Sequence, residues 1–184
     1  PIKKFKDNNV AVKLLTNAAL INDNHIKQLS GMFDYYLDSV QISLDGATSE
    51  TYKKIRKTDS FEKITTNIKK LVNAGINVTT VCTVNPVNYE EVVDTYRLSS
   101  DLGVREFAVG KVMYHNESHT NLILTNRDLF LLYARLNQNK LPNIKLISGF
   151  YTPIELLNIS EVKEIIEEDE YQEIIKSHKS VICI

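Results

Sequence analysis

Two hydrophobic patterns alternate along this chain, and the first is typical of buried strands. Short runs rich in β-branched and aliphatic residues recur, and polar residues or glycine bound each of them. Such runs favour strands because β-branched side chains pack well on a pleated surface. Strands are expected over residues 10–15, 39–44, 76–84 and 106–109, with a shorter one near 144–147.

The second pattern has the period of a helix. It is plainest over residues 60–74, where one apolar stripe consists of Phe61, Ile64, Ile68, Leu71 and Val72. A second, more acidic helix is expected over residues 160–179, and its charged positions predict a solvated face.

Polar residues suited to helix N-caps predict where other helices begin. These starts are Asn22–Asn24, Thr48 or Ser49, Asn88 and Thr125. Asn88 with Glu91, and Thr125 with Asp128, have the spacing of a capping box. Glycines suited to helix ends follow at Gly31, Gly75 and Gly103.

Strands separated by helices of this length predict right-handed crossovers and a parallel sheet. The fold class is therefore α/β, and the chain is long enough for one domain with a real core. A partial barrel and an open doubly wound sheet both satisfy this pattern. In either fold, ligands bind at the carboxyl ends of the strands. Polar or small residues at those ends are Thr16, Asn17, Ser43, Asp45, Gly46, Asn85 and Gly110, although Asn17, Asp45 and Gly46 are also ordinary turn formers.

Composition narrows the classes of function. The 184 residues carry a formal net charge of −1, so nothing favours a nucleic acid or an anionic membrane surface as a partner. The sequence contains neither a signal peptide nor an apolar run long enough to span a bilayer, and a cytoplasmic location is expected. The two cysteines, Cys82 and Cys183, are too few and too far apart for a disulfide framework.

Several segments resemble, in order and in spacing, the radical S-adenosylmethionine (SAM) superfamily. Residues 15–21 read L-T-N-A-A-L-I, similar to the third-strand motif L-T-N-G-T-L-I, although Ala18 replaces the usual glycine. Residues 40–46 match the fourth-strand motif V-x-I-S-L-D-G. The stretch from Glu50 through Arg56 to Ser60–Phe61, and further matches up to 102–104, extend the resemblance over about residues 10–112.

The resemblance implies a truncated, partial parallel (β/α) barrel of the radical SAM type, of which this chain supplies units three to six. It also implies a [4Fe-4S] cluster, bound through C-x-x-x-C-x-x-C, that reductively cleaves SAM to a 5′-deoxyadenosyl radical. This motif is absent from the sequence, which starts at Pro1 and stops soon after Cys183. We therefore interpret the chain as an inactive fragment of a longer enzyme, and expect the edge at residues 10–15 to be covered by residues 1–9, by the C-terminal segment or by a second copy.

Site residues follow from the same resemblance. Ser43 takes the place of the serine that hydrogen-bonds SAM, and Arg56 that of the arginine pairing with its carboxylate, a geometry that a planar guanidinium suits. Asp45 is expected to orient the turn or to contact ribose. Asn17 is expected to line the same site at the carboxyl ends of the strands. For Arg56 the alternative is a solvated position beside Lys53, Lys54 and Lys57.

The S-L-D-G form of the fourth-strand motif resembles enzymes with a C-terminal SPASM or twitch extension, which binds auxiliary iron–sulfur clusters. Residues 1–112 would be barrel core, and 113–184 the last barrel helix and the start of that extension. Cys183 could be an auxiliary cluster ligand or a plain buried cysteine, whereas Cys82 reads as core. His115 and His119 are four apart but lack a third metal ligand.

The reactions that the resemblance implies are peptide or protein maturation and haem biosynthesis, with a peptide or a small molecule as substrate. Two rival interpretations stay open at this point. One is a phosphate-binding TIM-type barrel enzyme, for which Gly110–Lys111 is the single hint. The other is a scaffold or peptide-binding domain that kept the fold without the cluster.

Overall fold

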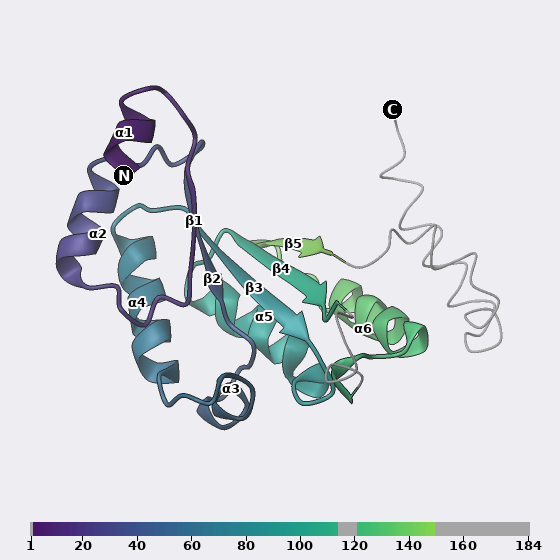
Figure 1. The fold of residues 1–184 in the computed structure, drawn as a ribbon. Helices are drawn as coiled ribbons and strands as arrows, with labels where there is room; N and C mark the ends of the chain where they lie inside the picture. Colours follow the sequence, from purple (N-terminus) through teal and green to yellow (C-terminus); the bar gives the residue numbers. More distant parts are fainter. Residues whose placement is uncertain (1, 114–120, 150–184) are drawn as a thin grey trace, which may run out of the picture.

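The computed structural model describes residues 2–113 and 121–149, in which five parallel strands form one sheet (Figure 1). The strands are β1 (Lys13–Thr16), β2 (Ser39–Ser43), β3 (Val78–Val84), β4 (Glu106–Lys111) and β5 (Lys145–Ser148). The helices are α1 (Ile2–Lys6), α2 (Asp23–Ser30), α3 (Ser49–Arg56), α4 (Phe61–Asn73), α5 (Val92–Asp101) and α6 (Asn126–Gln138), with a short 3-10 turn η1 (Tyr89–Glu91) before α5.

The strand order separates the two folds that the sequence left open. The strands follow one another as β1-β2-β3-β4-β5, and each pairs in parallel with its neighbour in the sequence. A doubly wound sheet would reverse this order at a switch point, whereas a barrel does not. The chain therefore forms a partial barrel, and the short strand expected near residues 144–147 is present as its fifth strand, β5.

The two faces of the sheet differ in burial. In β2, Val40 and Ile42 are fully buried, while Gln41 and Ser43, which alternate with them, are only partly buried. Right-handed crossovers in one direction place the connecting helices on a single face, which the alternating apolar residues cover. The stripe predicted for α4 packs there, since Phe61, Ile64, Ile68 and Leu71 are buried.

Local capping signals were good guides to most helix ends. Asn22 and Thr48 cap α2 and α3 through their side chains, and Thr125 forms both halves of a capping box with Asp128 at α6. Two of the glycines expected at helix ends have positive φ angles, Gly75 (73°) and Gly103 (79°). Gly31 ends α2 with an ordinary right-handed conformation instead.

The capping box predicted for Asn88 and Glu91 is wrong. The Asn88 side chain makes no cap hydrogen bond, and residues 89–91 form η1 before α5 begins. Both side chains instead bond to the segment that follows β2: Asn88 donates to the Asp45 carbonyl, and Glu91 accepts from the Ala47 N–H and from the Thr51 hydroxyl in the first turn of α3.

The first strand is shorter than predicted. Residues 10–12 lie outside the ladder, since the Val10 N–H donates to the Phe5 carbonyl after α1. Residues 2–9 do not hydrogen-bond to the outer edge of β1, and no other part of residues 2–113 or 121–149 does so. Of the three coverings expected for the edge at residues 10–15, residues 1–9 bond to its start, where Val10 contacts Phe5 and Lys6. The C-terminal segment lies outside the described residues, so covering by that segment or by a second copy stays a prediction.

Within the part of the chain that the structure describes, no helix combines the length and the apolar character needed to cross a bilayer. Cys183, His115, His119 and the acidic helix predicted over 160–179 lie outside the described residues.

Candidate functional site

The carboxyl ends of β1 to β4 meet at one edge of the sheet, and most of the predicted site residues gather there. The ladder places Ser43 of β2 level with Val81 of β3, and Val84 level with Lys111 of β4. The loops that leave these ends carry Asn17, Asp45 and Asn85. This is the edge at which parallel α/β folds bind ligands.

A buried carboxylate binds the arginine that the sequence singled out. Asp45 is 1% exposed, and its Oδ2 accepts a hydrogen bond of 2.5 Å from Arg56 Nε and an ion pair from Arg56 Nη2. Its Oδ1 accepts from the Thr83 N–H at 2.8 Å. Both carboxylate oxygens are therefore used inside the protein, which fits the turn-orienting role expected for Asp45 better than a contact with ribose.

Arg56 occupies a position between core and solvent. It is the last residue of α3, and its side chain remains 37% exposed although Asp45 is buried. The guanidinium presents its Nε and Nη2 side to Asp45, so Nη1 has no hydrogen-bond partner among the described residues. A guanidinium that is held in place and keeps free N–H donors at a strand end can bind a second carboxylate.

Ser43 lies on the face of the sheet opposite the buried Ile42 and Leu44. Its hydroxyl has no hydrogen-bond partner among the described residues. Its neighbours on this face are small, since the ladder aligns Ser43 with Val81 and Val81 with Ala108. Nothing in the described chain lies within 4 Å of where a Cβ on Gly110 would be, so the surface beside the strand ends is open.

The turn after β1 explains one departure from the family motif. Ala18, which replaces the usual glycine, has a left-handed backbone with φ of 60°. The buried Asn67 of α4 holds this turn by donating to the carbonyls of Ala18 (2.9 Å) and Ile21 (3.0 Å). Asn17 is exposed beside it, and its Oδ1 accepts from the Ala19 N–H, which leaves the amide group free to face the rim.

The loop after β3 supplies residues that the sequence reasoning misassigned. The buried Asn88 donates to the backbone carbonyls of Asp45 (2.9 Å) and Thr83 (3.1 Å) and accepts from the Asn85 N–H (2.8 Å). It thereby joins the ends of β2 and β3. The available signal was the spacing of Asn85, Asn88 and Glu91, three residues apart directly after a strand.

Glu91, from the same loop, reaches the first turn of α3. Its carboxylate accepts from the Ala47 N–H at 3.2 Å, from the Thr48 hydroxyl at 3.3 Å and from the Thr51 hydroxyl. The unit formed by β2 and α3 and the unit formed by β3 and α5 are therefore bonded to each other through side chains at this edge.

The described residues contain no ligand set for an iron–sulfur cluster. No group of three His, Cys, Asp or Glu side chains in residues 2–113 and 121–149 could hold a metal. Cys82 is fully buried, and this burial, reinforced by the nearby Asp45 charge, raises the pKa of its thiol well above the ordinary value. Cys82 lies in the hydrophobic core, and its prediction as a core residue is confirmed.

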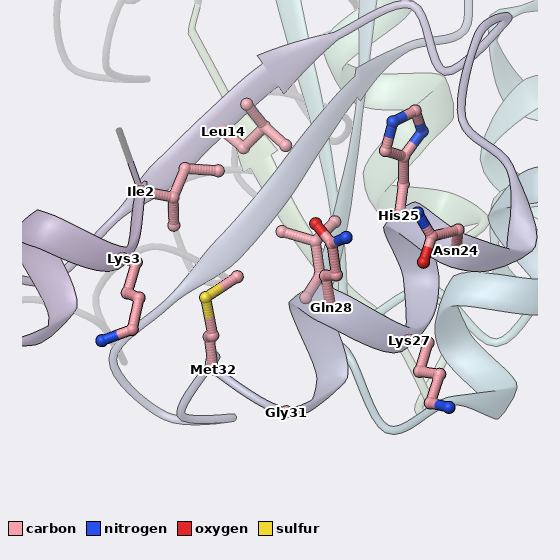
Figure 2. A pocket seen from close by; sticks show the side chains of 10 residues that line it. Ile2, Lys3, Leu14, Asn24, His25, Lys27, Gln28, Gly31 and Met32 are labelled. Carbon is pink, nitrogen blue, oxygen red and sulfur yellow. The ribbon is translucent and has the colours of Figure 1, made fainter.

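A cavity of about 710 Å³ lies away from this edge, between α1, β1 and α2 (Figure 2). Ile2, Leu14, Leu29 and Met32 give it an apolar lining, and Asn24, His25 and Gln28 stand at its side. None of the strand-end residues described above lines it.

Comparisons with known proteins agree with this geometry. Among relatives, the probable GTP 3′,8-cyclases of Saccharolobus islandicus and Saccharolobus solfataricus are 36% and 35% identical over 97 residues, which cover 52% of this chain. The chain spans about 30% of the length of these relatives.

Solved structures share the fold at low sequence identity. SuiB from Streptococcus suis superposes with a TM-score of 0.68 at 15% identity, over 94% of this chain and 40% of SuiB. The protein anSMEcpe, solved with bound AdoMet, gives 0.56 at 18% identity, over 80% of this chain and 43% of its own. A profile of the Radical SAM superfamily matches residues 2–99. The chain, with its one-directional parallel sheet and polar strand ends, therefore belongs to the radical SAM superfamily.

Proposed function

We propose that this chain is the SAM-binding part of a radical SAM enzyme, and that Arg56 binds the carboxylate of SAM. The observation that carries the proposal is the guanidinium held at the strand edge by the buried Asp45. A charge anchored in this way loses little further side-chain freedom when a ligand binds, so its hydrogen bonds are pre-organised. Family membership sets aside the phosphate-binding barrel as an alternative.

Ser43 and Asn17 complete the proposed site. The free Ser43 hydroxyl can donate to or accept from SAM, and the Asn17 amide can contact it from the turn after β1. The small side chain of Ala108 and the open space beside Gly110 leave room on the same face for a flat group such as the adenine ring. Together these residues would hold SAM along the ends of β1 to β4.

The cluster belongs to a part of the protein outside these residues. In radical SAM enzymes it supplies the electron that cleaves SAM, and the described residues hold no ligand set for it. The role of this chain's residues is to bind and orient SAM. Cys183 remains our candidate ligand of an auxiliary cluster in a SPASM or twitch extension, and the division of the chain at residue 112 remains a prediction.

For the substrate we propose a peptide, so that the whole enzyme would act in peptide or protein maturation. The support is the likeness of fold to SuiB, whose structure has also been solved bound to its precursor peptide SuiA. Shared fold at this identity does not fix a substrate, so peptide maturation is the proposal and haem-type cofactor biosynthesis the alternative carried over from the sequence.

A second candidate is a nucleotide substrate. The observation that favours it is the 36% identity to probable GTP 3′,8-cyclases over 97 residues. Incubation of the reduced full-length enzyme with SAM and GTP, followed by mass spectrometry, separates the two. Consumption of GTP would support the nucleotide, and unchanged GTP would leave the peptide as the better proposal.

The test of the proposed function uses the full-length protein, purified without oxygen, and measures 5′-deoxyadenosine formed from SAM under reducing conditions. We expect cluster-dependent formation by the wild type and a fall of at least tenfold at limiting SAM for Arg56→Ala. Lys54→Ala is the matched control, because Lys54 is an exposed cation on the same helix that pairs with Glu50. A folded full-length protein with neither iron nor SAM cleavage would overturn the proposal in favour of a scaffold.

A further inference from the structure

Glu91 is joined to the helix that carries Arg56, although it lies 40 residues from that helix in the sequence. Its carboxylate accepts from the Ala47 N–H and the Thr48 hydroxyl, and from the hydroxyl of Thr51, which is buried. These donors stand at the N-terminal turn of α3, whose N-cap is Thr48. A carboxylate at a helix N-terminus also interacts favourably with the helix dipole.

Helix α3 is thereby held at both ends. At its N-terminus Glu91 binds the cap and the first turn, and at its C-terminus Arg56 binds Asp45. The helix has eight residues, a rod of about 12 Å at 1.5 Å per residue. A tilt at the N-terminus of such a short rod moves its last residue, and with it the guanidinium.

Between these anchors, α3 is fixed mainly by Tyr52, whose ring is buried in the core and packs against Phe61 of α4. Thr51 and Tyr52 are its buried residues, and the other side chains of the helix are exposed or only partly buried. Gly46, before the helix, leaves no room for a side chain, since a Cβ there would lie 2.9 Å from a Thr51 methyl group. The loop after β2 and the start of α3 therefore pack tightly against each other beside the groups that Glu91 binds.

We propose that Glu91 is a positioning residue for the SAM site: it fixes α3 so that Arg56 can meet the ligand's carboxylate, without touching the ligand itself. This inference rests on the role proposed above for Arg56. It assigns a function to a side chain that the sequence pattern placed at another helix.

The alternative is that Glu91 only stabilises the fold. The two differ in which part of the ligand loses affinity. A positioning role through Arg56 weakens binding of the amino-acid part of SAM alone. A general loosening of the strand ends weakens binding of the adenosine part as well.

The experiment is a double-mutant cycle on the full-length protein, with equilibrium binding of two ligands. One is SAM, and the other is 5′-methylthioadenosine, which lacks the amino-acid part. For Glu91→Ala we expect the Kd for SAM to rise about tenfold and that for 5′-methylthioadenosine to change less than twofold. Glu91→Gln keeps one acceptor oxygen, so its effect on SAM should be smaller.

In the Arg56→Ala background, Glu91→Ala should cause no further loss of SAM affinity, because residues that act through one another are not additive. Glu90→Ala is the matched control: Glu90 is adjacent, exposed and paired with Arg135, and its loss should leave both ligands unaffected. If Glu91→Ala does not fold, Thr51→Val removes one donor to the same carboxylate at nearly equal volume and should weaken SAM alone.

Equal losses for the two ligands, an additive loss with Arg56→Ala, or no loss for SAM would each overturn the positioning role. Failure of the proposed function has a different signature, since Arg56→Ala itself would then leave SAM binding unchanged. The unfolding midpoint of every variant, measured in the same preparation, identifies those that have lost structure.

Discussion

Two buried carboxylates lie at opposite ends of β2, and their surroundings differ. Asp38 precedes the strand and Asp45 follows it, and both are 1% exposed. Asp38 accepts from the backbone N–H groups of Val12 and Asp34, each at 2.7 Å, and pairs with Lys6, whose side chain is largely covered. Asp45 has one backbone donor, and its cationic partner remains exposed at the ligand-binding edge.

The difference separates Asp38, which we interpret as structural, from Asp45, which we propose to be functional. Around Asp38 every donor comes from residues 6–34, so the group joins α1, the start of β1 and the loop before β2 into a closed unit. One partner of Asp45, Arg56, has N–H groups that are free to bind a ligand. Burial of a charge alone does not mark a site; the feature on which our proposal rests is a buried charge that holds an exposed one at the carboxyl edge of a parallel sheet.

The largest expected effect on stability is at Asp38. Asp38→Ala would leave two backbone N–H groups and the Lys6 ammonium without their acceptor, and breaking a buried pair in this way costs about 3 kcal/mol. We expect the free energy of unfolding, from denaturant titration of the purified protein, to fall by about that amount. The Kd for SAM of the folded fraction should not change. A changed Kd would contradict the division between the two carboxylates.

Asp45→Asn should reduce stability less than Asp38→Ala does, and should weaken SAM binding more. The amide oxygen can still accept from the Thr83 N–H, so we expect a loss of about 1 kcal/mol in the free energy of unfolding. The anchor of Arg56 loses its charge, and the Kd for SAM should rise several-fold. An unfolding cost as large as that of Asp38→Ala, with SAM affinity intact, would make Asp45 another purely structural group.

The pH dependence offers a third way to separate the two. Burial alone would raise the pKa of Asp38, but the hydrogen bond from Lys6, those from the Asp34 and Val12 amides and the Lys6 charge outweigh it and lower the pKa below 3.8. A carboxyl with a lowered folded pKa contributes stability above its unfolded value, and this contribution is lost as pH falls through the folded value. The stability difference between wild type and Asp38→Asn should therefore be constant above about pH 5 and shrink below about pH 4. A difference that stays constant down to pH 2 would contradict the lowered pKa.

The smallest expected effect concerns the turn after β1. Ala18 has a left-handed backbone, which costs an alanine about 1 kcal/mol more than a glycine. The methyl group that is lost is fully buried and contributes about 0.8 kcal/mol, so Ala18→Gly should stabilise the protein by only about 0.2 kcal/mol. Gly75→Ala is the mirror control: Gly75 has φ of 73° with no atom near its Cβ position, so the change should destabilise through backbone strain alone. If both variants stabilised the protein, or both destabilised it, this explanation would be wrong.

Much of the fold followed from local signals in the sequence. Runs of β-branched residues located the strands, and Asn22, Thr48 and Thr125 capped the helices as predicted. Barrel and doubly wound sheet have the same local pattern, so only the strand order separated them. The start of the first strand was placed too early because the Val10 N–H bonds to the Phe5 carbonyl instead of joining the ladder.

The site was predicted less completely than the fold. Asp45 and Arg56 were found by resemblance, but their pairing across 11 residues was not, since periodicity does not show which side chains meet. Glu91 was assigned to the helix next to it, because a capping box is read from spacing. Its actual partners, 40 to 44 residues earlier, are fixed by the packing of two neighbouring strand ends.

The central claim is that Arg56 binds the carboxylate of SAM. Its most direct test is the ratio of the Kd values for 5′-methylthioadenosine and SAM, measured for the full-length wild type and for Arg56→Ala. We expect the substitution to reduce the preference for SAM at least tenfold and to change the Kd for 5′-methylthioadenosine less than twofold. An unchanged ratio would contradict the proposed contact. It would favour the alternative that Arg56 is a solvated residue on the surface of α3.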